Sequence, residues 1–172
     1  HQEAEGDYRY LLHGLNPDAR PDVAPSLPRQ AGAALFVAEA AKHVGDAALA
    51  RSAMRAVRGL AQRMRPCPGV AGRCLINGRG RVKVGAHALL ALAALAVAEA
   101  LAADEVLAPD AAASMRTLAR QLGTVLRAAE AQAPRPGNFV HAWHRVDGRW
   151  RPLRRPQLYA DGQTALALWR LR

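Results

Sequence analysis

The sequence predicts a mainly α-helical protein in which buried and surface helices alternate, interrupted by two small β-hairpins. Hydrophobic residues make up 51% of the chain and aromatic residues only 5%. This Ala- and Leu-rich composition favours helices, because such side chains lose little rotamer freedom there. Apolar residues also recur at helical spacing over several segments. Two dipeptides, Asn77-Gly78 and Asp147-Gly148, are strong signals for hairpin turns.

A chain of 172 residues is long enough for one domain with a sizeable core. Residues 1–27 contain widely spaced prolines and predict an extended, Pro-rich arm. Residues 28–172 predict a single α-helical domain. No signal peptide is visible and the sequence starts at His1, so periplasmic or secreted and cytoplasmic locations all stay open.

The first pair of helices is expected at about 29–43 and 46–64. Pro28 suits the first turn of a helix, and Gly45 suits its end. The second segment is amphipathic, with its apolar residues on one helical face and its arginines on another. It is therefore predicted to cover the first helix from outside.

A β-hairpin is expected at about 73–83, turning at Asn77-Gly78. The two cysteines of the chain, Cys67 and Cys74, lie in CPGVAGRC just before it. Their spacing does not match a CxxC zinc or redox motif, and the intervening Pro and Gly residues would let the loop close on itself. The sequence leaves a disulfide and two free thiols open.

The segment from 84 to 103 is apolar on nearly all sides, which is typical of a helix buried in a protein core. Its length also fits a membrane span. However, Glu99 and His87 are costly in a bilayer and Ala promotes insertion only weakly. The sequence therefore predicts a buried helix and no membrane span.

Three further elements follow. An amphipathic helix is expected at about 109–132, starting at Pro109-Asp110. A second hairpin is expected at about 138–153, with Asp147-Gly148 at its turn. A short apolar helix that starts near Asp161 closes the chain.

The formal net charge of +10 points to an anionic partner such as an acidic glycan, nucleic acid or a membrane surface. The 24 basic residues include only two lysines, Lys42 and Lys83, which also fits the codon bias of a GC-rich genome. The arginines are scattered over many segments and form no long run. Nucleic acid is therefore disfavoured as a partner.

Three stretches repeat one pattern, a glycine followed by an almost wholly apolar Ala/Leu helix. They are AGAALFVAEAA, VGAHALLALAALAVAEA and DGQTALALWRL, with Gly32, Gly85 and Gly162 near their starts. Since amphipathic helices follow the first two, the pattern predicts inner helices covered by outer ones. The N-termini of parallel inner helices gather on one side, where unpaired N–H groups favour a polar or anionic ligand.

These segments resemble inner helices of (α/α)6-toroid proteins that act on carbohydrates, including the N-acylglucosamine 2-epimerase-like and glucuronyl C5-epimerase-like families. Arg29–Gly32 resembles an Arg-x-x-Gly motif of those families, and Tyr159–Leu168 resembles their Tyr-x-x-Gly-[Glu/Gln]-x-x-x-Ala-Leu pattern. The resemblance implies the alternating inner and outer hairpins of an (α/α) toroid. The chain holds about two and a half of the six hairpins, which implies a fragment of a longer toroid or a compact domain that has lost the rest.

The resemblance implies a carbohydrate-processing domain, epimerase- or lyase-like, or a carbohydrate-binding domain, for an acidic or N-acetylated sugar. Glycoside hydrolysis needs two carboxylates and only Asp161 is well placed, whereas proton abstraction with a steadying Arg fits the residues present. The alternative is a non-catalytic helical module that binds a protein partner, or the missing half of the toroid, through an open apolar face. No nucleotide, serine-hydrolase or zinc-protease motif occurs, and no cofactor is expected.

Candidate substrate-binding residues lie at the predicted helix starts. By resemblance Arg29 clamps a substrate carboxylate, with Gln30 beside it, although both also fit structural roles. Asp161 is either a catalytic carboxylate or a helix N-cap. Gln163 either binds a sugar hydroxyl or is an ordinary polar residue of a first turn.

His87, His141 and Tyr159 are the candidate acid–base groups. His87, one turn into the buried helix, is either a general base or a satisfied core histidine. In a strand His141 and Trp143 share one face and His144 takes the other, which suits sugar stacking and acid–base chemistry, or plain packing of the hairpin. No third ligand for a metal is found beside the histidines, so no metal site is predicted.

Overall fold

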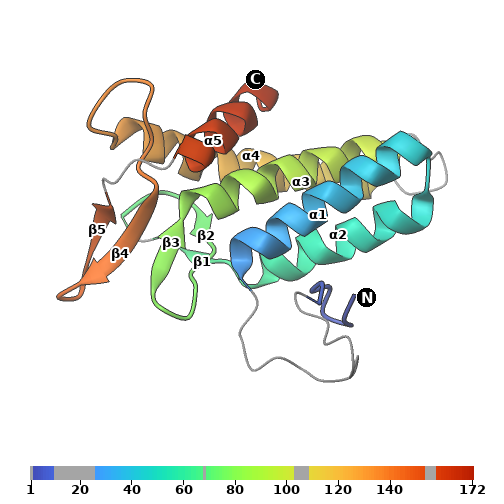
Figure 1. Cartoon of the computed structure of the whole chain (residues 1–172), viewed down its shortest axis with the longest axis horizontal. Helices are drawn as coiled ribbons and strands as arrows, with labels where there is room; N and C mark the ends of the chain where they lie inside the picture. The colour runs from blue at the N-terminus through green and yellow to red at the C-terminus, as the bar shows by residue number, and fades with distance from the viewer. Residues whose placement is uncertain (1, 10–25, 68, 103–108, 154–157) are drawn as a thin grey trace.

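The computed structural model of the chain describes residues 2–9, 26–67, 69–102, 109–153 and 158–172. These residues form five α-helices and five short strands (Figure 1). The prediction of a mainly helical protein with two small β-structures is therefore confirmed. Most of the predicted N-terminal arm, residues 10–25, lies outside the described residues.

Helices α1 (Leu27–Val44) and α2 (Ala47–Gln62) form an antiparallel pair close to the predicted bounds (Figure 1). The carboxylate of Asp46 caps α2, because it accepts hydrogen bonds from the N–H groups of Ala48 at 2.7 Å and Leu49 at 3.1 Å. The side chain of Ser26, at the N-cap position of α1, makes no such bond. The two helices therefore start differently, since only α2 is capped by an acid.

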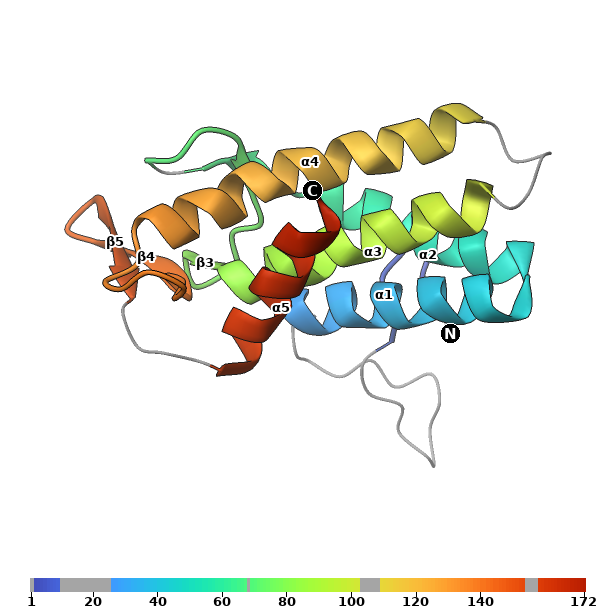
Figure 2. The same ribbon diagram turned by 90° about the horizontal axis from the view of Figure 1, so that it is seen from above.

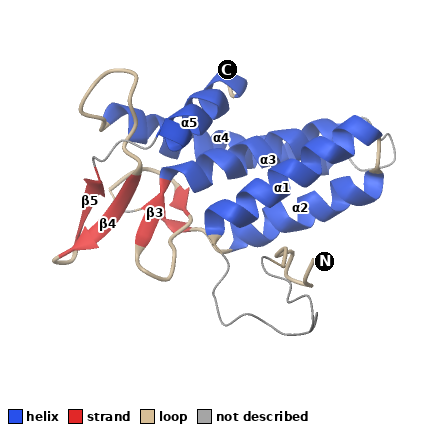
Figure 3. Ribbon diagram, in the orientation of Figure 1, coloured by secondary structure: helices blue, strands red, loops and turns tan. Residues whose placement is uncertain are grey.

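Helix α3 (Val84–Ala102) lies at the centre of the protein and contacts each of the other four helices (Figure 3). It is long and apolar enough to cross a membrane, but 72% of its most apolar window is buried inside the protein. This burial agrees with the predicted core helix. Figures 1 and 2 place the starts of α1 and α3 at the same end of the molecule, beside the strands.

Helix α4 (Pro109–Ala131) packs its apolar face on α3, as its periodicity predicts. Helix α5 (Leu158–Arg170) crosses over α3 (Figure 2). Of the three predicted inner helices, only α3 is largely buried. Helices α1 and α5 each have one side that no described residue covers. The large hydrophobic side chains there are 75% exposed for Phe36, 48% for Leu166 and 67% for Trp169.

Four charged side chains tie α1, α3 and α5 together. Glu39 of α1 and Glu99 of α3 each contact both Lys42 and Arg170, at distances between 2.5 and 3.1 Å. Burial alone raises the pKa of each carboxyl, but the hydrogen bonds from Lys42 and Arg170 outweigh it and lower the pKa of both. The ring of opposite charges fixes the C-terminal end of α5 against the first and third helices.

The first predicted hairpin, at 73–83, is wrong in its pairing. Strand β2 (Arg73–Cys74) pairs antiparallel with β1 (Arg65–Pro66), and Cys67 forms a disulfide with Cys74 across this small loop. The Asn77-Gly78 turn does form, but a single Ile76–Val82 bridge joins its two sides. The disulfide and the pairing with β1 therefore keep β2 from pairing with β3, while the Asn77-Gly78 turn itself forms.

The second hairpin is confirmed. Strands β4 (Ala142–Val146) and β5 (Arg149–Leu153) pair antiparallel around Asp147 and Gly148, whose φ angles are 49° and 75°. Two positive φ angles are what a two-residue hairpin turn of the favoured twist requires. Strand β3 (Arg81–Lys83) adds to the other edge of β4, which makes a three-stranded sheet in the order β3-β4-β5.

Candidate functional site

A cavity of about 300 Å³ opens where three helices begin, and we call it the helix-mouth cavity. Helix α1 contributes Pro28 and Arg29, α3 contributes Gly85, Ala86 and Leu89, and α5 contributes Tyr159, Ala160 and Gln163. The three-stranded sheet and its approach supply the remaining wall, namely Arg81, Lys83, His141, Ala142 and Leu153. A volume near 300 Å³ is at the lower end for small-molecule sites.

The chain brings these elements together through its connections. Strand β3 runs directly into α3, and the N–H of Val84 donates to the carbonyl of His141 at 3.0 Å. The start of α3 is thereby held beside the start of β4. The N–H groups in the first turn of a helix have no partner within the helix. The cavity therefore lies at the positive dipole ends of three helices, although Pro28 has no N–H and the N–H of Val84 is already bonded.

Gly85 lets the first turn of α5 come close to that of α3. A Cβ at this position would lie 3.2 Å from Oε1 of Gln163 and 3.5 Å from Cβ of Ala160. The other two repeat glycines are less crowded, since a Cβ at Gly32 would meet only Leu89 at 3.8 Å and one at Gly162 would meet nothing within 4 Å. A close approach that a side chain would disturb thus occurs at one of the three repeat glycines.

The charges around the helix-mouth cavity are of one sign. Arg29, Arg81 and Lys83 line it, and no described lining residue is Asp or Glu. Guanidinium and ammonium groups beside helix N-termini favour an anionic ligand, and a planar guanidinium matches a carboxylate through two parallel hydrogen bonds. The cavity is therefore suited to a small ligand that carries a carboxylate or another anion.

Four of the eight predicted site residues line the helix-mouth cavity. Arg29, His141, Tyr159 and Gln163 come from α1, the approach to β4, and α5, which are far apart in the sequence. His141 lies just before β4 and not within it, so the strand alternation that pairs it with Trp143 does not apply. Trp143 and His144 do alternate between faces as expected.

His87 lies apart from the cavity lining, in the core. It is fully buried, its Nε2 accepts a hydrogen bond from the N–H of Leu75 at 2.9 Å, and its Nδ1 lies 2.8 Å from the carbonyl of Lys83. This arrangement requires the neutral ring with its proton on Nδ1. Burial lowers the pKa of His87 to about 4, only partly opposed by the bond to Lys83. The structure therefore gives His87 the role of a satisfied core histidine.

Gln30 and Trp143 also have structural roles. The Gln30 side chain is buried and bonds both backbone groups of Tyr8, accepting at 2.8 Å and donating at 2.6 Å. It pins the described N-terminal segment to α1. Trp143 is buried on the opposite side of the sheet from the cavity, where its Nε1–H donates to Gln132 at 2.9 Å. Neither side chain lines the helix-mouth cavity.

Asp161 lies inside the first turn of α5, which begins at Leu158, so the N-cap interpretation is wrong. Its side chain is not part of the cavity lining. Its Oδ1 is buried and has no hydrogen-bond partner within the described part of the chain. A buried acceptor without a partner is unusual in a folded protein.

Sequence reasoning missed Arg81 and Lys83 as lining residues. Both flank the buried Val82 in β3, and alternation along a strand places them on the same face. The basic–apolar–basic pattern of RVK was visible in the sequence. However, the hairpin expected at 73–83 did not join this strand to β4. The sequence therefore offered no reason to place the two basic residues beside the helix starts.

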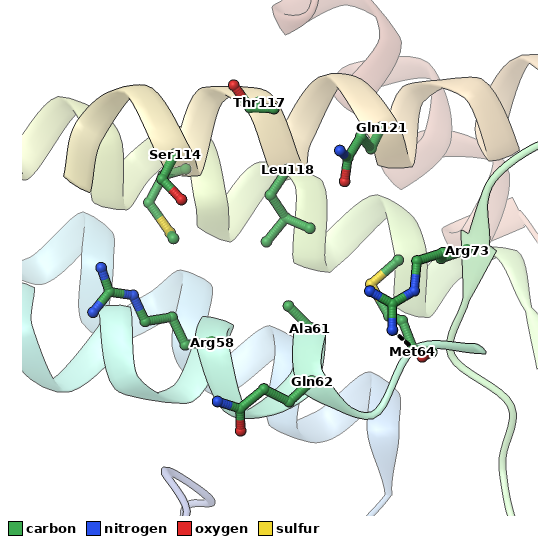
Figure 4. A pocket seen from close by; sticks show the side chains of 10 residues that line it. Arg58, Ala61, Gln62, Met64, Arg73, Ser114, Thr117, Leu118 and Gln121 are labelled. Atoms are coloured by element: carbon green, nitrogen blue, oxygen red, sulfur yellow. Dashed lines mark hydrogen bonds between the residues drawn. The ribbon is translucent and has the colours of Figure 1, made fainter. Parts of the chain in front are cut away.

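A second and larger cavity, of about 440 Å³, lies between α2 and α4, and we call it the α2–α4 groove. Figure 4 shows Ala61 of α2 pointing toward Leu118 of α4, with Arg58, Ser114 and Gln121 around them. Arg73 closes one end and donates to the carbonyl of Met64 at 2.7 Å. None of the predicted site residues lines this groove.

Within the described ranges, no three His, Cys, Asp or Glu side chains gather in a way that could hold a metal ion. Comparison of the chain with protein-family models, characterised proteins and solved structures finds no match. The arrangement of the cavity itself therefore carries the functional argument.

Proposed function

We propose that the chain binds an acidic saccharide in the helix-mouth cavity, with the sugar carboxylate held by Arg29 and the first turns of the helices. The observation that carries this proposal is the meeting of three helix starts with Arg29, Arg81 and Lys83 at one cavity without a described carboxylate. Backbone donors and cationic side chains of this kind stabilise an anion together. The same features favour a uronic acid over a neutral N-acetylated sugar.

The proposed architecture is a segment of an (α/α) toroid, with α1, α3 and α5 as inner helices and α2 and α4 as outer ones. It is supported by the common direction of α1 and α3 and by the packing of α2 on both of them. The packing of α5 on both α3 and α4 is consistent with this scheme, but α5 crosses α3 instead of running parallel to it. In this arrangement inner-helix starts line the ligand side, as the cavity requires.

The chemistry we propose is proton abstraction next to the sugar carboxylate, as in an epimerase or lyase. His141 and Tyr159 are the lining groups that can accept and return a proton, while Arg29 stabilises the negative charge that develops on the carboxylate. An epimerase returns the proton to the opposite face of the carbon, and a lyase instead breaks the neighbouring carbon–oxygen bond. Hydrolysis is not supported, since it generally uses two carboxylates.

The test is calorimetric titration of the full chain with glucuronate, galacturonate and N-acetylglucosamine at two salt concentrations. Saturable binding of the uronates that weakens in Arg29→Ala supports the proposal, while equal binding of N-acetylglucosamine would contradict the acidic preference. Exchange of the sugar C5 proton in heavy water, followed by NMR with wild type and His141→Gln, tests turnover. Binding without exchange would leave a carbohydrate-binding domain and no enzyme.

The second candidate is a helical module that binds a protein partner through an apolar face. The observation that favours it is the exposure of Phe36 on α1 and of Leu166 and Trp169 on α5, two helices that the Arg170–Glu39 ion pair joins. Exposed apolar side chains that gather on neighbouring helices often mark an interface. If Phe36→Ser with Trp169→Ser changes neither solubility nor sedimentation behaviour, this candidate loses its support.

A further inference from the structure

The three-stranded sheet has one strongly basic face, defined by Arg81, Lys83, His144, Arg149 and Arg151. The register shows why they share it: Arg81 pairs with His144, which pairs with Arg151, while Lys83 and Arg149 lie two residues along their strands. Directly paired residues point to the same side of a sheet. The four Arg and Lys side chains of this face are exposed. The opposite face carries Val82 and Trp143, both buried against the core.

This basic face is continuous with the helix-mouth cavity. The row nearest the helices, Lys83–Ala142–Leu153, lines the cavity together with Arg81 from the next row. Beyond it the Arg81–His144–Arg151 row and then Arg149 follow toward the hairpin turn. Four residues along a strand span about 14 Å, which is longer than one sugar ring. The cavity therefore opens onto a basic track that extends past a single sugar.

Nothing in the strands balances this charge. The three strands contain no Asp or Glu, and Asp147 lies in the turn at the far tip. Arg149 and Arg151 lie two residues apart on β5 and share this face, about 7 Å from each other, which is within the Debye length at physiological salt. Nδ1 of His144, which pairs with both Arg81 and Arg151, is buried without a hydrogen-bond partner among described residues. Like charges this close repel each other unless an anionic ligand offsets them.

We propose that the ligand is a polymeric acidic saccharide, whose chain lies along the basic sheet face while one of its units occupies the helix-mouth cavity. This rests on the proposed function, because it extends the ligand of the same site. A polyuronate has a negative charge on each unit and so matches successive basic rows. Single-stranded nucleic acid would also match the charge, but its bases stack on exposed aromatic side chains. Trp143 and Trp150 of this sheet lie on the other face, and the exposed Tyr159 stands only at the cavity end of the track.

The experiment is calorimetric titration of the full chain with galacturonate and with its dimer, tetramer and hexamer at constant salt. Wild type is expected to bind the tetramer about tenfold more tightly than the monomer. The double variant R149Q/R151Q is expected to lose this gain and to keep the monomer affinity, since neither residue lines the cavity. The matched control is Arg145→Gln, which removes an exposed arginine from the other face of the same hairpin and is expected to change neither affinity.

Equal affinity for monomer and hexamer would overturn the inference while the proposed function stands. An equal loss in Arg145→Gln would also overturn it, because net charge and not the basic face would then explain the effect. If the tetramer binds through Arg149 and Arg151 but the monomer does not bind, the basic sheet face remains a saccharide-binding surface. The proposed function of the helix-mouth cavity would then be wrong. Oligothymidylate of equal charge that binds wild type more tightly than the tetramer, and loses affinity in R149Q/R151Q, would assign the face to nucleic acid instead.

Discussion

The helix-mouth cavity and the α2–α4 groove both contain arginines, but they differ in what the backbone supplies. The groove is the larger, at about 440 Å³ against about 300 Å³. It runs along the flanks of two helices, where N–H groups are already bonded within the helix. The smaller cavity lies at helix starts, where such groups lack intrahelical partners. Orientation of the helices, and not volume, is therefore the reason why we propose the helix-mouth cavity as the anion site.

Arg29→Ala should cause the largest loss of uronate affinity. Loss of a charge-assisted hydrogen bond to a carboxylate costs about 2 kcal/mol, or roughly 30-fold in affinity for a uronate. The matched control is Arg58→Ala, an exposed arginine of the α2–α4 groove, which should leave the affinity unchanged. Calorimetry measures both, and an equal or larger loss in the Arg58 variant would move the site to the groove.

His87→Leu should destabilise the fold by about 2 kcal/mol, because it leaves the buried N–H of Leu75 without its partner. The wild-type pH dependence follows from its pKa, which is lowered from 6.5 to about 4. Between these values the unfolded chain binds more protons than the folded one. The free energy of unfolding therefore falls by about 3 kcal/mol as the pH drops through this window, and levels off below it.

Urea unfolding at several pH values between 4 and 7 tests this. His87→Leu should show a flatter profile, whereas a control change of the exposed His43 to Gln should keep the wild-type slope. Because His87 also bonds the carbonyl of Lys83, its loss should weaken uronate binding only indirectly. A His87 variant of normal stability whose proton-exchange activity is abolished would contradict the structural role.

Gly85→Ala should have a smaller effect on binding, near 1 kcal/mol or about fivefold. The new Cβ would stand 3.2 Å from Oε1 of Gln163, so this lining side chain has to shift. Gly32→Ala is the control, because its Cβ would make only an ordinary contact at 3.8 Å. If both alanines weaken binding equally, the close approach of α3 and α5 does not shape the cavity.

Arg151→Gln should have the smallest effect, and it should be stabilising. Removing one charge of the Arg149–Arg151 pair on the basic sheet face relieves repulsion by about 0.3 kcal/mol in the absence of ligand. Thermal unfolding at low and high salt measures this, and the gain should shrink at high salt. A loss of stability would show that Arg151 is satisfied by neighbours and is not held there for a ligand.

The sequence predicted the helices well because their signals are local and repeated. The bounds of α1 to α4 agree within a few residues, and the burial of α3 follows from its apolar composition on all sides. The start of α5 was placed late, since Asp161 resembles a cap but lies within the first turn. The residues around Asp161 do not by themselves distinguish an N-cap position from one in the first turn.

Nonlocal pairing explains what the sequence did not predict. The Cys67–Cys74 disulfide and the β1–β2 pairing take β2 away from β3, and β3 then joins β4, about sixty residues later in the chain. That pairing is what brings Arg81 and Lys83 to the cavity. Among the candidates, Arg29, His141, Tyr159 and Gln163 gather there, whereas His87, Gln30 and Trp143 are used by the core.

The most direct test of the central claim is a crystal structure of the chain with bound galacturonate trisaccharide. We expect a carboxylate within hydrogen-bond distance of Arg29 and of backbone N–H groups at the helix starts, with the next sugar over the basic sheet face. A saccharide seated in the α2–α4 groove, or one whose carboxylate faces solvent while its ring lies on Phe36 and Trp169, would contradict it.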